Sequence, residues 1–408
     1  MPRYGNDTFG ATQPGDLAID MRKHAFWLTL ALVLLSPPSL LGQQQPAYPP
    51  SSSASDTPKI DFSGILFANF QYRTDPAAKD QNRFDLERAY LTARAAISER
   101  VGARVTIDVF QQTNPNNDGF YRGWVVRAKY AFLQYDAVKA ESPDDWSALA
   151  RFGMLHTVMV EHLETFWPRW LGNAAEERFG YFSSADMGGA AQLALPNKLG
   201  ELYTTITNGP GYTSRETDRF KDYAARLSLT PLSKSESAML KTLTLTAWGY
   251  KGALASRFVS GGPGQIGPVG SGLRRDRWGG FAGLRDPRLT AVVSYSNRID
   301  ESELGNNTLA SPRLVVEATG KLFSTFALVR PLQLVDDNYK TPLRLVGRYD
   351  RFRPDDSADG RTRFIVAGVI WDLARTTSVS VDYQEQTASN PALAPTTKTW
   401  FMHIVAGF

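Results

Sequence analysis

Two histidines and a glutamate stand close together in the segment HTVMVEH, at His156, Glu161 and His162. Imidazole nitrogens and carboxylate oxygens are zinc ligands, so these three side chains have the chemistry to bind a metal ion. Their spacing does not fit the two-histidine patterns of zinc-dependent hydrolases. We therefore interpret them as polar residues of a long connection and predict no metal site.

The other candidate catalytic or cofactor-binding motifs are weaker still. GPGQIG at 262–267 has the glycine spacing of a dinucleotide fingerprint, but no helical pattern follows it, so we interpret it as an external loop. No serine sits in a nucleophile elbow, and four histidines leave few candidates for a Ser/His/acid set. The chain has no cysteine for a thiolate site. We predict no catalytic residue and no cofactor, and keep a barrel enzyme as a minor alternative.

Basic residues at alternate positions of apolar segments form a clearer pattern. In FDLERAYLTARAAIS, Leu91 and its apolar neighbours share one face of a strand, while Arg88 and Arg94 share the other. Arginine binds oxyanions through two parallel hydrogen bonds and stays charged at physiological pH. The predicted anion-binding bases are Arg88, Arg94, Arg104, Arg127, Lys129, Arg151, Arg226, Arg344 and Arg348.

Only three acids share the phase of these nine bases: Asp108, Asp350 and Asp382. If that phase lines a water-filled interior, the excess of bases predicts a preference for anions. Arg88 and Arg94 lie roughly 20 Å apart on one strand at about 3.3 Å per residue, so successive strands could form a ladder of bases. The alternative is that the arginines pair with the acids and only keep the interior polar.

The elements that position these residues are strands. From Lys59 to Phe408 a period of two recurs in segments of about ten residues, and no helical period competes with it. A sheet of this length needs closed edges and satisfied backbone groups in lipid, which a barrel provides. The fold class is therefore all-β, a transmembrane 16-stranded antiparallel β-barrel, rather than a soluble β-sandwich. The sixteen segments are 60–72, 84–98, 102–111, 124–136, 148–154, 187–195, 202–209, 222–231, 242–251, 277–284, 289–296, 318–331, 343–352, 363–371, 377–386 and 399–408.

The connections alternate in length, as in outer-membrane barrels. Short joints are predicted at 99–101, 196–200, 285–288 and 373–376, and long excursions at 112–122, 155–184, 209–221, 252–275 and 297–312. The bulky, aromatic excursion 155–184 is predicted to fold into the lumen as a constriction. Its charged residues are Glu161, Glu164, Arg169, Glu176, Glu177 and Arg178, so acids on the loop would face bases on the wall.

The first sixty residues differ in composition from the rest. Residues 21–45 place Arg22 and Lys23 ahead of a short apolar run and two prolines, which is the layout of a secretory signal peptide. Residues 1–42 are thus predicted to be a start-site extension plus signal peptide, followed by a Pro/Ser-rich linker at 43–58 and the barrel at 59–408. Export implies localisation in the bacterial outer membrane.

The order of several segments resembles the phosphate-selective porin O and P family of bacterial outer membranes. The similar patterns are FDLERAYLTARAAIS, ARFGM before the long loop, ITNGPG, AARLSLTPL, GRYDRF and the terminal Phe408. The resemblance implies a trimeric, sixteen-stranded anion channel with lumenal arginines and loop lysines. This chain departs from the pattern because its inserted loop contains no lysine.

Together these observations predict an outer-membrane porin for passive diffusion of small hydrophilic solutes, preferring anions, with phosphate or other oxyanions as candidates. The expected partners are outer-membrane lipid, small anions, two further copies in a homotrimer, and the barrel-assembly machinery through Phe408. A net charge of +4 is too small to predict nucleic-acid binding. A non-transporting barrel, serving as an adhesin or structural protein, is the main alternative.

Overall fold

The computed structural model describes residues 58–111, 123–142, 144–216, 218–256, 272–390 and 394–408. The predicted extension and signal peptide, nearly all of the linker and the GPGQIG segment lie outside these residues. In the described part, no helix is long and apolar enough to cross a membrane.

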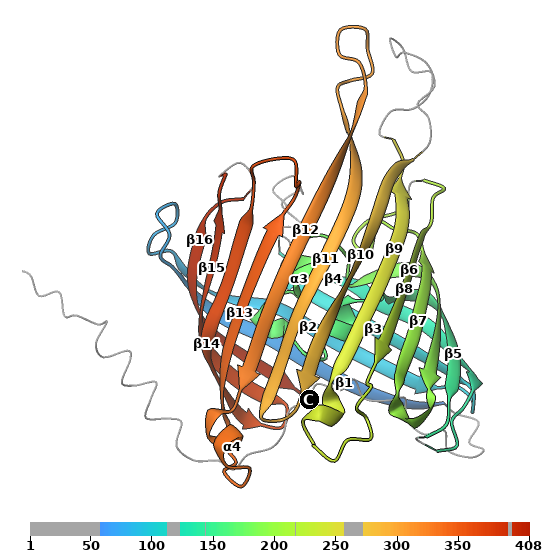
Figure 1. The fold of residues 1–408 in the computed structure, drawn as a ribbon, viewed down its shortest axis with the longest axis vertical. Helices are drawn as coiled ribbons and strands as arrows, with labels where there is room; N and C mark the ends of the chain where they lie inside the picture. Colours follow the sequence, from blue (N-terminus) through green and yellow to red (C-terminus); the bar gives the residue numbers. More distant parts are fainter. Residues whose placement is uncertain (1–57, 112–122, 143, 217, 257–271, 391–393) are drawn as a thin grey trace, which may run out of the picture. The chain divides into compact units, whose positions relative to one another are not determined.

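Sixteen strands pair in sequence order, and β1 (Lys59–Arg73) closes the barrel by pairing with β16 (Thr397–Gly407). Every pairing is antiparallel, and the strands run obliquely around the wall (Figure 1). The predicted 16-stranded antiparallel barrel is confirmed. The remaining strands are β2 (Asn82–Ala96), β3 (Val101–Gln111), β4 (Trp124–Val138), β5 (Ser147–His156), β6 (Ala185–Leu195), β7 (Gly200–Thr207), β8 (Asp222–Leu229), β9 (Thr244–Leu254), β10 (Leu273–Arg285), β11 (Leu289–Leu304), β12 (Leu314–Val329), β13 (Leu343–Arg353), β14 (Thr362–Ala374) and β15 (Thr377–Ala388).

Side chains alternate between the two faces of the wall, as the period of two predicts. On β2, Leu91 is 43% exposed on the outer face, whereas Arg94 is buried on the inner face. Outward aromatic residues include Trp278, Tyr295 and Trp400. This band of exposed apolar and aromatic side chains has the composition of a lipid-facing surface.

In the described part of the chain, the connections follow the predicted alternation with two differences; the predicted excursion at 112–122 and most of that at 252–275 lie outside this part. β11 runs on to Leu304 and stays paired with β12 up to Leu314, so the predicted excursion at 297–312 is wrong in extent. Continued pairing satisfies backbone groups that an open loop would leave to water. The second difference is that two connections on the short-turn side are longer than a tight turn. Residues 230–243 contain η4 (Leu240–Thr242), and residues 330–342 contain α4 (Pro331–Val335) (Figure 1). On the same side, η3 (Pro196–Lys198) forms a tight turn.

The long connection 157–184 lies inside the barrel and contains α2 (Val160–Leu163), η2 (Arg169–Leu171) and α3 (Ala175–Arg178). Its apolar side chains are almost fully buried: Val158, Val160 and Leu171 have no exposed surface. They form the main hydrophobic cluster together with inward side chains of strands, among them Phe281, Leu322, Phe326, Val346, Phe352, Phe364, Val366 and Ile370.

This cluster corrects one expectation. The inner phase of β10 to β16 was predicted to meet water, but much of it is apolar and packs on the loop. The physical reason is that the loop carries aromatic side chains into the lumen, and these are buried favourably only against other apolar side chains. Strand alternation alone cannot distinguish a wet interior from one covered by a loop.

Candidate functional site: the lumen around loop 157–184

Aromatic pairs seat the loop on one side of the lumen. Trp167 packs edge-on against Phe326 of β12 with ring centroids 5.1 Å apart, and Phe182 packs against Trp248 of β9 at 4.9 Å. Phe179 stacks on Phe352 at 4.8 Å. Such pairs contribute about 0.5–1.5 kcal/mol each beyond the burial of their area. The loop is therefore packed against the barrel wall through its aromatic side chains.

Arginines from the wall hold the backbone of the same loop. The carbonyl groups that they bind belong to residues outside the three short helices of the loop. Arg348 donates to the carbonyl of Asn173 at 2.7 Å, and Arg298 donates to that of Phe179 at 3.1 Å. Arg226 and Arg277 donate to the carbonyls of Val158 and Tyr181. Sequence reasoning missed Arg277 and Arg298, although both lie on the inward phase of their strands.

Most of the predicted anion-binding bases have carboxylate partners. Arg88 and Arg127 share Asp108, at 3.3 and 3.0 Å, and Arg348 binds Asp350 at 2.7 Å. The other pairs are Arg104 with Glu161, Arg226 with Glu201, and Arg344 with Asp372. For these six bases the pairing alternative describes the structure better than a ladder of free charges.

Two inward acids of these pairs, Glu201 and Asp372, were absent from the predicted set of lumenal acids. Their position on the inner phase of β7 and β14 was the available signal, since Tyr203 and Ile370 beside them are also buried inside. Among the described residues, the third predicted acid, Asp382, forms no ion pair with an arginine; its carboxylate lies 3.4 Å from His403. The inner face therefore carries more acids than the three predicted.

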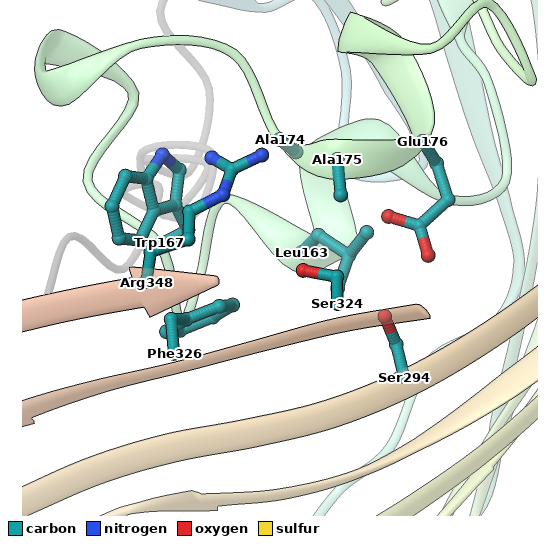
Figure 2. Close-up of a pocket in the computed structure, with 9 residues that line it drawn as sticks. All are labelled: Leu163, Trp167, Ala174, Ala175, Glu176, Ser294, Ser324, Phe326 and Arg348. Carbon is teal, nitrogen blue, oxygen red and sulfur yellow. The ribbon is translucent and has the colours of Figure 1, made fainter. Parts of the chain in front are cut away.

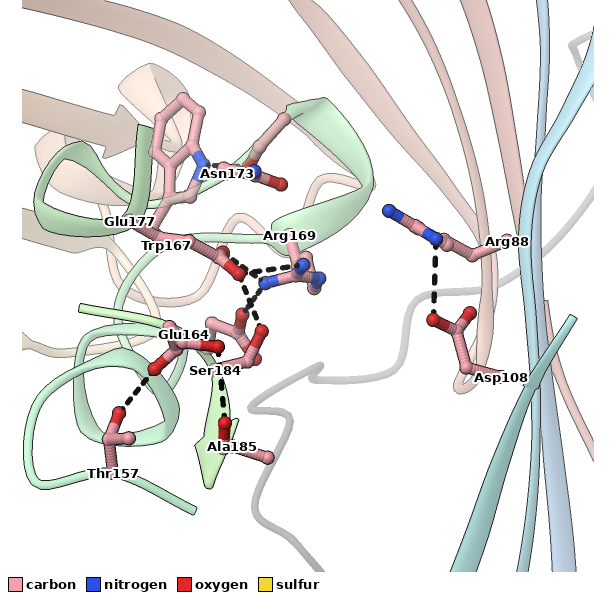
Figure 3. Close-up of polar contacts among 12 residues, drawn as sticks. Arg88, Asp108, Thr157, Glu164, Trp167, Arg169, Asn173, Glu177, Ser184 and Ala185 are labelled. Carbon is pink, nitrogen blue, oxygen red and sulfur yellow. Dashed lines mark hydrogen bonds and ion pairs between the residues drawn. The ribbon is translucent and has the colours of Figure 1, made fainter. Parts of the chain in front are cut away.

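The charges of the loop are largely balanced within the loop itself. Arg169 binds both Glu164 and Glu177, the latter at 2.6 Å (Figure 3). Its Nε also donates to the hydroxyl of Tyr90 at 3.1 Å. Of the loop acids, Glu161 alone pairs with a wall base within the described part of the chain: Arg104, at 3.1 Å. The predicted field of loop acids against wall bases is thus mostly cancelled, because Arg169 lies among those acids.

Neighbouring glutamates of α3 lie in opposite environments. Burial raises the pKa of Glu176, whose carboxylate accepts a hydrogen bond from Ser296 at 3.1 Å. Burial also acts on Glu177, but Arg169 outweighs it and lowers the pKa. Glu176 borders a very small cavity of about 10 Å³ that also contacts Ser294, Ser324 and Arg348 (Figure 2).

The pKa values of three further titratable groups of the loop are shifted. Burial alone would raise the pKa of Glu161, but His156, Arg104 and Arg151 lower it well below its usual value. Burial, with Arg226 and Arg285 nearby, lowers the pKa of His162 well below its usual value, so its imidazole is neutral at pH 7. Burial and Arg348 lower the pKa of Arg178 to about 10, and its guanidinium lies on the ring of Phe364 at 3.5 Å.

A cavity of about 580 Å³, which we call the vestibule, opens between the loop and the short-turn ends of the strands. Its lining includes seven basic side chains: Arg94, Arg104, Lys129, Arg169, Arg285, Arg344 and Arg375. Only two acidic side chains line it, Glu161 and Glu164, and both are bound in ion pairs with bases of the same cavity. The vestibule therefore carries a clear positive excess.

Three vestibule bases form no ion pair within the described part of the chain: Lys129, Arg285 and Arg375. Lys129 lies over the rings of Tyr90 and Tyr130, at 4.3 and 5.4 Å, and Arg285 lies 5.8 Å from the ring of Phe166. Arg285 and Arg375 escaped sequence reasoning because they stand at strand ends, where the face of a side chain is hardest to assign.

The last predicted base, Arg151, and the histidine motif meet in the structure. Arg151 hydrogen-bonds Gln134 at 2.9 Å and lies 2.9 Å from Nε2 of His156. His162 lies apart from His156, between the hydroxyls of Ser228 and Thr246 at 3.1 and 3.2 Å. Among the described residues, no group of three or more potential ligands could hold a metal ion.

Solved structures with a similar fold are bacterial outer-membrane proteins. They include OmpF of Salmonella typhi in complex with daunomycin (TM-score 0.58, 13% identity, 86% of this chain and 98% of that chain) and OmpT of Vibrio cholerae (0.54, 12%, 87% and 99%). An anion-selective porin from Comamonas acidovorans also matches (0.54, 10%, 86% and 100%). At these identities the likeness shows the fold alone.

No protein-family model matches this chain. No curated protein sequence matches it either. The resemblance to the phosphate-selective porin O and P family stays a prediction.

Proposed function

We propose that this chain is an outer-membrane porin, a channel for passive diffusion of small hydrophilic solutes that prefers anions. The observation that carries the proposal is the vestibule, where seven basic side chains stand against two acidic ones that are already paired. Low-dielectric walls strengthen the field of such fixed charges, so anions are enriched and cations depleted. No catalytic role is assigned to any residue.

Several parts of the proposal rest on supporting arguments. Outer-membrane localisation and contact with lipid agree with the exposed apolar and aromatic outer face. A similar solved structure is a trimer form of OmpT of Vibrio cholerae, which supports a homotrimer here. The terminal strand β16 ends beside Phe408, the residue we propose as the signal for the barrel-assembly machinery.

The anion class is proposed as oxyanions, phosphate included. Arginine and lysine donors in the vestibule suit carboxylate, sulfate and phosphate oxygens alike. The loop supplies no lysine, so no feature of the loop favours phosphate over the other oxyanions. Competition of phosphate, sulfate and acetate against chloride current ranks them. Current suppression by phosphate at much lower concentration than by the others would favour phosphate selectivity.

One observation favours the alternative of a non-transporting barrel. The loop fills part of the lumen with a packed apolar cluster, which narrows the space left for solutes. Single-channel recording in a planar lipid bilayer separates the two functions. A porin gives steady conductance steps, and a silent bilayer containing correctly folded protein would refute the proposed function.

A further inference from the structure

The lining of the vestibule combines two kinds of side chain, basic and apolar. Two of its bases, Lys129 and Arg285, form no ion pair within the described part of the chain, and Arg94 lines the same cavity. Its apolar lining comes from the loop and the wall: Phe166, Trp167, Pro168 and Trp170, with Phe67, Leu328 and Val405. Pockets that bind organic ligands commonly combine a mostly apolar surface with a few well-placed polar groups.

The bases are themselves placed on aromatic rings. Lys129 lies over Tyr90 and Tyr130, Arg104 over Tyr130 at 4.3 Å, and Arg285 near Phe166. A cation on an aromatic face is partly desolvated. An anion that binds there must also shed water, which costs least for a carboxylate carrying an apolar body and most for strongly hydrated phosphate.

From this geometry we propose that the vestibule binds organic monocarboxylates with an aromatic or bulky apolar body in preference to inorganic phosphate. The carboxylate pairs with a base that forms no ion pair, Lys129 or Arg285, and the apolar body lies against the loop surface of Phe166 to Trp170. The inference deepens the proposed function, because it names the anion class that an anion-preferring channel of this shape would take.

Direct binding tests the inference without relying on current. The probe is 4-fluorobenzoate, followed by fluorine NMR with the full-length mature protein in lipid nanodiscs and with empty nanodiscs as the blank. Unlabelled benzoate, cyclohexanecarboxylate, acetate and inorganic phosphate compete in turn. The expected order is benzoate and cyclohexanecarboxylate at least about tenfold tighter than acetate or phosphate, since the apolar body adds buried area.

Charge-removing variants locate the site. Lys129→Gln with Arg285→Gln is expected to weaken fluorobenzoate binding about tenfold. Arg351→Gln, which removes a charge from an exposed residue of β13, should leave binding unchanged. Circular dichroism and resistance to denaturant verify that each variant is folded.

Equal competition by acetate and benzoate would overturn the inference, and so would unchanged binding in the folded double variant. Either result leaves the proposed channel intact. Conversely, selective benzoate binding by a protein that conducts no current would support the inference and contradict the proposed channel function.

Discussion

Arginine has two structural roles inside this barrel, and they follow from what each guanidinium meets. Arg348 and Arg298 donate to loop carbonyls, whereas Arg88 and Arg127 neutralise the buried Asp108. Leaving any of these partners unpaired in a poorly hydrated interior costs about 1–3 kcal/mol. Arginine content alone is therefore a poor measure of anion selectivity in a barrel with an inserted loop.

At the same scale, the adjacent glutamates of α3 give opposite predictions. Glu176→Gln should stabilise the protein at pH 7, because burial opposes ionisation of this carboxyl and raises its pKa. A carboxyl group whose pKa is raised by folding destabilises the protein only at pH values above its unfolded pKa of about 4.5. The stability gained by Glu176→Gln should therefore shrink as the pH falls toward 4.5. Denaturant titration of the folded barrel in lipid at pH 7 and pH 4 measures both effects.

Glu177→Gln is the matched opposite and should destabilise by about 1–3 kcal/mol at pH 7, since Arg169 loses one of its two carboxylates. Its lowered pKa means that its stabilising contribution is present above about pH 4.5 and is lost only as the pH falls through the lower folded value. Equal effects of the two substitutions at pH 7 would contradict the environments described for α3.

The inward or outward face of the predicted bases followed from alternation, but their partners did not. Arg344 and Asp372 lie on neighbouring strands and pair only because the register brings them together. The contacts of Arg226 and Arg348 with the loop carbonyls depend on a fold of the loop that no period in 155–184 specifies. Local sequence patterns carry no information about such long-range contacts.

At the scale of elements, the seat of the loop is testable through two phenylalanines of β12. Phe326→Ala removes the partner of Trp167 and should lower the free energy of unfolding by about 3 kcal/mol, as for other buried phenylalanines. It should also enlarge or destabilise the conductance, because the loop loses a main contact. Phe323 points outward and is 38% exposed, so Phe323→Ala is the control. Similar losses in both variants would argue against a specific seat.

The seam between β1 and β16 depends on a glycine. A Cβ on Gly64 would lie 2.2 Å from the ring of Phe408, while one on Gly347 would meet nothing within 4 Å. Gly64 and Phe408 also exchange two backbone hydrogen bonds, of 2.8 and 3.0 Å. Gly64 thus provides the space in which the last side chain closes the barrel.

Gly64→Ala should therefore cost about 1 kcal/mol of stability by displacing that ring, and Gly347→Ala should be close to neutral. In a Phe408→Ala background the cost of Gly64→Ala should vanish, which a double-mutant cycle of unfolding free energies measures. Additive effects would show that the two residues do not interact.

At the scale of the whole barrel, the sequence predicted the number of strands and their order because lipid imposes a strict alternation on every crossing. Residues 311–332 are long enough for two strands, but a seventeenth strand would put the end of the last strand on the side of the long loops; the structure has the single strand β12 there. The apolar inner phase of Phe352, Phe364 and Val366 was beyond reach, because the loop that covers it comes from a distant part of the chain.

The reversal potential of the reconstituted protein in a potassium chloride gradient tests the central claim most directly. We expect the reversal potential to be shifted from zero toward the equilibrium potential of chloride, and this shift to become smaller when Lys129, Arg285 and Arg375 are all changed to glutamine. Arg351→Gln should leave it unchanged. A reversal potential shifted toward the equilibrium potential of potassium in the unaltered protein would contradict the claim that the basic vestibule sets a preference for anions.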